Sequence, residues 1–200
     1  MYDMSENLNI AQIGHPILRQ KTKTVAIENI KTENIQKTID KMIKIMKNAN
    51  GAGLAANQIF EKHRICVLEI LNNNRYKYIG NIPLKVIINP VITVLDTKDT
   101  FNSYEGCLSV PNLRGKVKRF NSINVKYYDR EANFIDENIK GLQAIVYQHE
   151  IDHLDGKLFT DKVYDNSTLV SFENYIKYYQ EDYEKELEKF INASESKHIA

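Results

Sequence analysis

The sequence predicts an α+β fold in which mixed or antiparallel β-sheets surround a central metal-binding helix, with one helix nearer the N-terminus and a long helix nearer the C-terminus. Three observations lead to this prediction. Short β-branched segments lie between residues 64 and 128, apolar residues recur at helical spacing on both sides of them, and residues 148–156 read QHEIDHLDG. The length of 200 residues suits a single domain, residues 1–200.

The composition limits the classes of function. A formal net charge of +1 gives no reason to expect direct nucleic-acid binding. No run of about 18 apolar residues could span a membrane. The opening residues resemble neither a secretory signal nor a transit peptide. The two cysteines, Cys66 and Cys107, are too few for a disulfide framework. We therefore expect a cytoplasmic protein without a membrane partner.

The first helix is predicted from Thr32 to about Asn50, where apolar residues follow one helical face and Gly51 is placed to end the helix. The apolar positions are Ile35, Ile39, Met42, Ile43 and Met46. Residues 51–58 then read GAGLAANQ. A phosphate-binding loop is an alternative here, but no Gly-Lys-Ser/Thr ending follows and no strand precedes it. A close-packed loop that lines a narrow cleft, with Gln58 as a polar side chain, fits better.

The β segments are predicted from their apolar, β-branched character and from the turn residues between them. Strands are expected at residues 64–71, 76–82 and 122–128, with a strand pair or a bent strand at residues 85–95 and a hairpin turn at residues 129–133. Cys66 lies inside the first of these strands, and we interpret it as a small buried hydrophobic residue.

The central helix is predicted from Gly141 to Gly156. Its residues His149 and His153 stand at positions i and i+4, so both imidazoles can point at one cation. Glu150 lies about 100° round the helix, beside the cation rather than bound to it, where a general base belongs. The histidines continue an inward-facing apolar stripe, which begins with Leu142, Ile145 and Val146.

The last helix is predicted over about residues 167–192, and residues 193–200 are expected to be frayed. One face of this helix is apolar and aromatic, while the opposite face is charged. The apolar face consists of Phe172, Ile176, Tyr179, Tyr183, Leu187 and Phe190.

A hydrolytic metal site of this type needs a third protein ligand and one open position. One class of peptidase continues the pattern to a third histidine, but this chain has Phe159 at that position. Glu173, about 20 residues after the histidines, is a weaker candidate because it lies in a helix whose charged residues face solvent. Cys107, in a loop between β segments with the sequence EGCLS, is the better candidate, because a thiolate is a strong ligand for Zn²⁺ or Fe²⁺.

Three motifs taken together resemble those of the peptide deformylases. The first is the glycine-alanine loop that ends at Gln58, the second runs from Glu105 to Ser109, and the third from His149 to Gly156. The similarity extends along most of the chain, from Gly14-His15-Pro16 to Leu158-Phe159. The resemblance implies removal of the formyl group from the N-terminal formylmethionine of newly made polypeptides, with release of formate.

The resemblance also implies roles for individual residues. Cys107, His149 and His153 would bind one divalent ion, Fe²⁺ by family preference, with Zn²⁺, Ni²⁺ or Co²⁺ as alternatives in a purified sample. Glu150 would accept a proton from the attacking water and return it to the leaving amine.

Two further groups would stabilise the oxyanion by donating hydrogen bonds: the side-chain amide of Gln58 and the backbone N–H of Leu108. Gly53, Glu105, Gly106 and Arg114 are expected to bind substrate or to position the loops that do. An apolar pocket for the methionine side chain would be lined by Leu142, Ile145 and Val146 on the central helix.

The expected partners are N-formylmethionyl nascent peptides. Some deformylases are thought to meet the ribosome through a basic C-terminal helix, but residues 173–198 of this chain are net acidic, which disfavours that contact. The acidic residues are Glu173, Glu181, Asp182, Glu184, Glu186, Glu188 and Glu195, against Lys177, Lys185, Lys189 and Lys197. The inserted segment at residues 72–83 leaves the family subtype open.

Two other interpretations compete with a deformylase. An endopeptidase of the H-E-x-x-H type is disfavoured by Phe159 and by the quality of Cys107 as a ligand. A catalytically silent relative that only binds peptide termini should have lost a motif residue. This chain has lost none of them.

Overall fold

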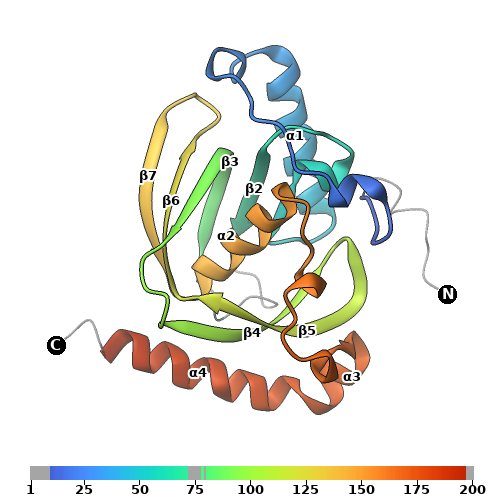
Figure 1. The fold of residues 1–200 in the computed structure, drawn as a ribbon, viewed down its shortest axis with the longest axis vertical. Helices are drawn as coiled ribbons and strands as arrows, with labels where there is room; N and C mark the ends of the chain where they lie inside the picture. Colours follow the sequence, from blue (N-terminus) through green and yellow to red (C-terminus); the bar gives the residue numbers. More distant parts are fainter. Residues whose placement is uncertain (1–9, 72–77, 79, 197–200) are drawn as a thin grey trace.

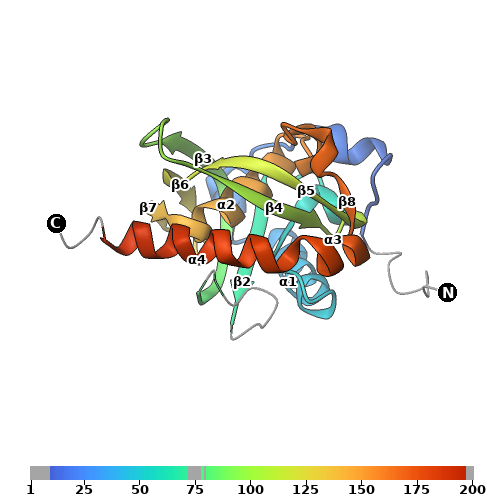
Figure 2. The same ribbon diagram turned by 90° about the horizontal axis from the view of Figure 1, so that it is seen from below.

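The computed structural model describes residues 10–71, 78 and 80–196, and the predicted α+β class is confirmed (Figure 1). The central helix α2 (Gly141–Leu154) runs through the middle of the molecule, with one β-sheet along one side and a second sheet along another (Figures 1 and 2). None of the helices in the described ranges has the length and apolar character that crossing a bilayer requires.

The larger sheet has five strands in the order β1-β2-β3-β6-β7, and each neighbouring pair is antiparallel. A hairpin turn joins β6 to β7, in which the N–H of Asp129 donates to the carbonyl of Asn133, as the predicted turn requires. The strands are β1 (Gly53–Ala55), β2 (Ile65–Ile70), β3 (Ile82–Val94), β6 (Ser122–Tyr128) and β7 (Phe134–Lys140).

The smaller sheet consists of β4 (Thr100–Cys107), β5 (Val110–Phe120) and β8 (Val170–Ser171), again antiparallel. The predicted loop around Cys107 is therefore wrong, because Glu105, Gly106 and Cys107 end a strand. The sequence did not indicate this strand because its residues include few β-branched or strictly alternating apolar side chains, and pairing with β5 stabilises it instead.

The remaining helices lie on the outer faces of these sheets. They are α1 (Glu33–Asn48), α3 (Phe172–Tyr178) and α4 (Gln180–Ser196). Short 3₁₀ helices connect the larger elements: η1 (Pro16–Arg19), η2 (Ile27–Asn29), η3 (Ala56–Ile59), η5 (Phe159–Asp161) and η6 (Asn166–Thr168).

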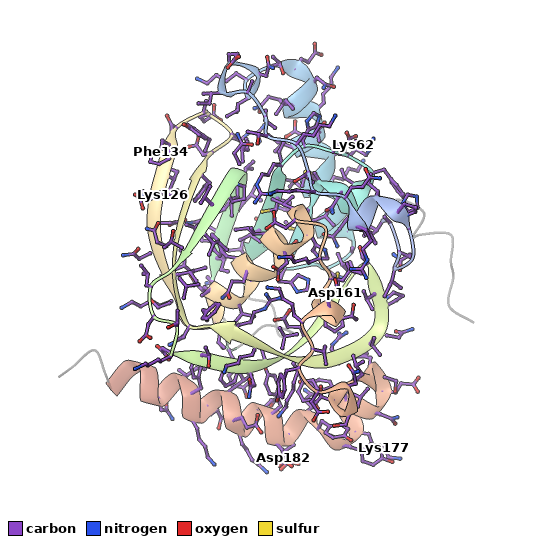
Figure 3. All side chains as sticks on the ribbon, viewed as in Figure 1. Lys62, Lys126, Phe134, Asp161, Lys177 and Asp182 are labelled. Atoms are coloured by element: carbon purple, nitrogen blue, oxygen red, sulfur yellow. The ribbon has the colours of Figure 1, made fainter. Side chains whose placement is uncertain are left out.

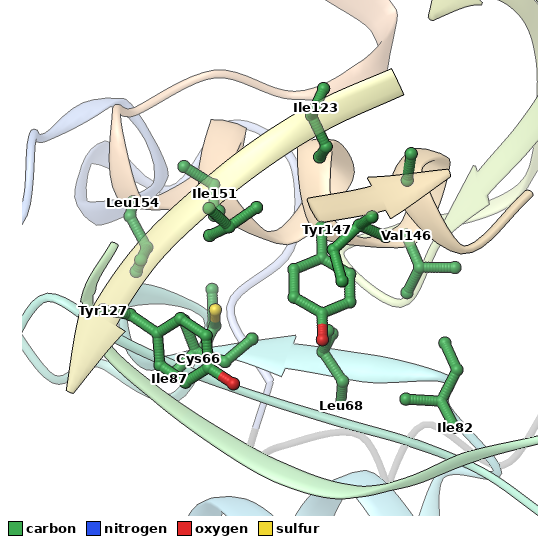
Figure 4. Packing of buried hydrophobic residues seen from close by; sticks show 14 of the residues in the cluster. Cys66, Leu68, Ile82, Ile87, Ile123, Tyr127, Val146, Tyr147, Ile151 and Leu154 are labelled. Atoms are coloured by element: carbon green, nitrogen blue, oxygen red, sulfur yellow. The ribbon is translucent and has the colours of Figure 1, made fainter. Parts of the chain in front are cut away.

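The core between α2 and the five-stranded sheet explains why α2 is buried on almost every side. Alternate residues of β2 point to opposite faces of the sheet. Cys66 and Leu68 face α2, where they meet Tyr147 and Ile151 (Figure 4). Ile65 and Val67 face α1 in a second core cluster. Cys66 is fully buried, so the interpretation of this residue as a small core side chain is confirmed.

Two predictions about the C-terminal segment need correction. The predicted helix over residues 167–192 is two helices, because the helical backbone breaks at Tyr179 between α3 and α4. Residues 193–196 continue α4, so the predicted frayed end is wrong there, while residues 197–200 lie outside the described residues. Most of the strand predicted at residues 76–82 also lies outside the described residues. For residues 85–95 the bent-strand alternative is confirmed, because β3 (Ile82–Val94) is one long strand with a φ of 56° at Asn89.

Replacement of Leu68 by alanine tests the core that supports α2. Leu68 is fully buried between the sheet and α2, so Leu68→Ala should lower the free energy of unfolding by about 2–5 kcal/mol in urea denaturation. The control is Leu95→Ala, at a side chain that is 48% exposed, which should change stability by less than about 0.5 kcal/mol. Equal losses in both variants would contradict this description of the core.

Candidate active site

The fold brings together the three side chains predicted as metal ligands. Cys107 lies at the end of β4, while His149 and His153 lie one turn apart on α2. The possible ligand atoms of these residues all lie within 4.8 Å of one another. Among the residues that the structure describes, this is the one group of three His, Cys, Asp or Glu side chains that could hold a metal ion, so Glu173 is not the third member of the cluster.

The geometry fits a tetrahedral metal site. Ligand distances of about 2.0–2.3 Å place the ligand atoms of a tetrahedral ion about 3.5 Å apart. The sulfur of Cys107 and Nε2 of His153 are 3.2 Å apart. The two imidazole rings are nearly perpendicular, with their centroids 4.9 Å apart, so both can direct a nitrogen toward one point.

The orientation of His149 is fixed by a carboxylate behind it. Nδ1 of His149 lies 2.8 Å from Oε2 of Glu105, so an N–H at Nδ1 can donate to the carboxylate while Nε2 faces the other ligands. The same carboxylate receives two hydrogen bonds from Arg119, at 2.7 and 2.9 Å. Arg119 in turn donates to Asp152 at 2.5 Å. The buried guanidinium therefore joins the second sheet to the central helix directly behind the ligands.

The charges in this network set the ionisation of its members. Burial alone would raise the pKa of Glu105, but Arg119 and His149 lower it to about 2. Burial also opposes ionisation of Cys107, yet His153 and His149 lower the pKa of its thiol well below the usual value. By contrast, burial raises the pKa of Cys66. The cysteine in the site is thus the one prepared to act as a thiolate.

Glu150 is buried beside the ligands and is in position to act as a base. Its Oε2 has no hydrogen-bond partner among the described residues. Burial raises the pKa of Glu150 to about 7, against the opposing effect of His149 and His153. Gly53 allows this placement, since a Cβ there would lie 2.5 Å from Oε1 of Glu150. The backbone at Gly53 therefore lies directly against the Glu150 side chain.

Comparisons with known proteins agree with this arrangement. A model of the polypeptide deformylase family matches residues 7–168. The chain belongs to the peptide deformylase family. It is 39% identical to peptide deformylase 2 of Nostoc sp. over 170 residues, covering 85% of this chain and 93% of the relative. It is 43% identical to a peptide deformylase of Leptospira biflexa over 156 residues, 77% of this chain and 86% of that relative.

A solved structure of the same family shows the same fold. The Met-Ala-Ser-bound class I type b peptide deformylase of Acinetobacter baumannii superposes with a TM-score of 0.72 at 30% identity, covering 77% of this chain and 96% of that chain. The protein is thus a metal-dependent hydrolase that removes the N-formyl group from the formylmethionine of new polypeptides. The three motifs predicted a deformylase, and this prediction is confirmed in preference to the endopeptidase of the H-E-x-x-H type. Phe159, which replaces a third histidine, is buried with its ring stacked 6.5 Å from that of His149.

The deformylase site opens into a pocket of about 290 Å³. All the residues predicted for substrate binding line it, together with Gln58, Leu108, Cys107, His149 and Glu150. The predicted set is Gly53, Glu105, Gly106, Arg114, Leu142, Ile145 and Val146. A Cβ at position 106 would overlap the Arg114 guanidinium, which would have to shift; this guanidinium also lies 4.4 Å from the ring centre of Phe172.

Gln58 reaches the deformylase site from the 3₁₀ helix η3, so the predicted loop at residues 51–58 is wrong for Gly53–Ala55, which form β1, and for Gln58. Its Oε1 accepts a hydrogen bond from the N–H of Ala55 at 2.7 Å, which fixes the direction of the amide. Its Nε2 then donates to Oγ of Ser109 at 3.0 Å and lies 3.6 Å from the sulfur of Cys107. The amide donor therefore points into the site.

Sequence reasoning missed two sets of residues in the deformylase site. Arg119 was not identified. Gly115, Val117 and Arg119 alternate with more exposed residues along β5, and this alternation is the signal that could have shown that Arg119 points inward. Tyr183 and Leu187 of α4 also line the pocket. Asp152, on α2 beside His153, is buried and pairs with Arg119 and Lys162.

Removal of the Arg119 charge tests the network behind the ligands. Arg119→Met should lower the free energy of unfolding by about 3–5 kcal/mol, because Glu105 and Asp152 would lose a buried partner, and should also weaken metal retention. Urea denaturation and metal analysis after dialysis measure the two effects. Arg130→Met, at an exposed ion pair with Asp40, is the control and should cost less than about 1 kcal/mol. An unchanged unfolding midpoint for Arg119→Met would contradict the role given to this network.

Proposed function

We propose that the deformylase reaction of this chain uses an Fe²⁺ ion held by Cys107, His149 and His153, with Glu150 as the proton-transferring group. The observation that carries the proposal is the convergence of three ligand atoms within 4.8 Å beside a buried carboxylate with an unpaired oxygen. A bound divalent ion supplies Lewis acidity for the formyl carbonyl and lowers the pKa of water. The Cys-His₂ donor set suits both Fe²⁺ and Zn²⁺, and the choice of Fe²⁺ follows the family.

Glu150 moves the proton in this proposal. Its carboxylate accepts a proton from the attacking water and later gives that proton to the leaving amine of methionine. A pKa of about 7 supports both roles, because the side chain can take up and release a proton near neutral pH. Burial keeps bulk water away from the carboxylate, so the proton stays available for the amine.

Two donors stabilise the negative charge that develops on the formyl oxygen. The first is Nε2 of Gln58, whose direction is fixed by the hydrogen bond between Oε1 and Ala55. The second is the backbone N–H of Leu108, next to Cys107 and on the wall of the same pocket. Donors held in place before the reaction cost little reorganisation when the charge appears.

The methionine side chain occupies the apolar part of the pocket, against Leu142, Ile145 and Val146 on α2. These side chains lie one or two turns before the ligand histidines on the same helix, so a substrate whose formyl group reaches the metal site has its side chain beside them. Gly106 and Arg114, at the pocket wall on β4 and β5, are placed to contact the peptide that follows the methionine.

The proposed setting is the cytoplasm, which is consistent with two free cysteines in a fold without disulfides among the described residues. The substrates are nascent formylmethionyl chains. Helix α4 does not support a contact with ribosomal RNA, because Lys185 is engaged by Glu181 and Asp182, and acidic residues predominate along the helix. We therefore propose neither direct nucleic-acid binding nor ribosome docking through α4.

Formate release tests the central roles. The protein loaded with Fe²⁺, Ni²⁺, Co²⁺ or Zn²⁺ should release formate from formyl-Met-Ala-Ser. Glu150→Gln should retain the metal but lower kcat by about 10²–10⁴-fold, because the carboxylate can no longer accept a proton. Cys107→Ser should lose metal on dialysis, since a thiolate ligand is replaced by a hydroxyl. No release by a folded, loaded protein with any of the four ions would refute the proposal.

A second prediction concerns the oxyanion donor. Gln58→Glu retains an oxygen that can accept the N–H of Ala55 but replaces the donor Nε2 with an acceptor. It should lower kcat by about 10²–10³-fold and change KM little, as measured by steady-state formate release. Metal content and unfolding midpoint are measured in the same preparation. A kcat equal to that of the parent protein would show that Gln58 does not contact the reacting oxygen.

A further inference from the structure

The pocket for the methionine side chain is completed by a part of the chain that the family model does not match. The model ends at residue 168, whereas α4 begins at Gln180. Tyr183 and Leu187 of α4 nevertheless line the same pocket as Leu142 and Ile145 of α2. The wall opposite α2 is therefore supplied by this chain's own C-terminal helix.

The side chains of α4 and α2 pack directly together. Leu142, Ile145, Tyr183 and Leu187 form one buried cluster, and each is at most 8% exposed. Side chains fill the space between α4 and the strands above it (Figure 3). Leu187 belongs to the same cluster as the α2 residues that line the pocket. The size of the Leu187 side chain therefore limits how far a substrate side chain can extend into the pocket.

Several contacts fix α4 against β4. Oη of Tyr183 and Oγ of Ser103 lie 2.9 Å apart, within hydrogen-bonding distance and buried. The ring of Tyr183 also meets that of Tyr104 edge to face at 5.4 Å, and one helical turn beyond Leu187 the ring of Phe190 packs 4.3 Å from that of Phe101. These contacts from three strand residues hold the helix in one register, so the position of Leu187 in the pocket is well defined.

We propose that Leu187, held in place by the anchoring of Tyr183, is a specificity-determining residue that sets the depth of the pocket for the side chain of the formylated residue. This inference rests on the proposed function, which places the methionine side chain against Leu142 and Ile145. Leu187 closes the pocket at a length that accommodates methionine and excludes larger side chains. The C-terminal helix thus takes part in substrate selection.

Two variants with opposite effects test this role. In Leu187→Ala the pocket is deeper, so kcat/KM for formyl-Phe-Ala-Ser relative to formyl-Met-Ala-Ser should rise at least about tenfold, the discrimination that methylene-sized changes give in apolar pockets. In Leu187→Phe the pocket is shallower, so kcat/KM for formyl-Met-Ala-Ser should fall at least about tenfold while that for the short formyl-Ala-Ala-Ser is retained.

The matched control is Ile191→Ala, which removes a branched side chain of the same size one turn further along α4. Ile191 packs on the same cluster but does not line the pocket. If α4 only stabilises the fold, Ile191→Ala and Leu187→Ala should alter all substrates in parallel. A substrate ratio that shifts no more in the Leu187 variants than in Ile191→Ala would overturn the inference.

Binding of the product peptides separates this inference from the proposed function. Calorimetric titration of the parent, Leu187→Ala and Ile191→Ala with Met-Ala-Ser and Phe-Ala-Ser needs no turnover. In Leu187→Ala, but not in Ile191→Ala, the Kd for Phe-Ala-Ser divided by the Kd for Met-Ala-Ser should fall at least about tenfold. This result supports the inference even if the protein releases no formate. Unchanged Kd ratios in a protein that does release formate refute the role of Leu187 and leave the reaction assignment intact.

Discussion

The buried guanidinium of Arg119 is the interaction on which the rest of the site depends. It binds Glu105 on β4 through two hydrogen bonds and Asp152 on α2 through a third, so one side chain of the smaller sheet is tied to the central helix. Glu105 then orients His149, one of the three candidate metal ligands. Because a buried charge without a partner is strongly destabilising, the strand that carries Cys107 and the helix that carries both histidines are held in one relative position.

Because these elements are held in fixed positions, each of them can supply different groups to the site. Helix α2 supplies two candidate metal ligands, Glu150 and one wall of the pocket, and it can do so because sheets, helices and loops cover nearly all of its faces. Strand β4 supplies Cys107, and the 3₁₀ helix η3 after β1 supplies Gln58. The chemistry thus lies where three separate segments meet, and residues of a fourth segment, α4, line the same pocket.

The sequence predicted the local parts of the site well. The spacing of His149 and His153 is a property of any helix, and α1 and α2 have nearly the predicted ends. The local sequence patterns gave wrong predictions where contacts with other segments of the chain determine the structure. Residues 100–107 form a strand through pairing with β5, and the long C-terminal pattern is divided at Tyr179, although its apolar spacing continues across the break.

By itself, the sequence determined the α+β class, the three motifs and the identity of the residues in them, because helical spacing and residue chemistry are local properties. Only the tertiary structure decided that Arg119 joins Glu105, 14 residues away, to Asp152, 33 residues away. It also decided that Leu187 faces the pocket rather than another part of the core. Both facts depend on contacts between distant segments, and a single sequence carries no periodicity that specifies which buried surfaces meet.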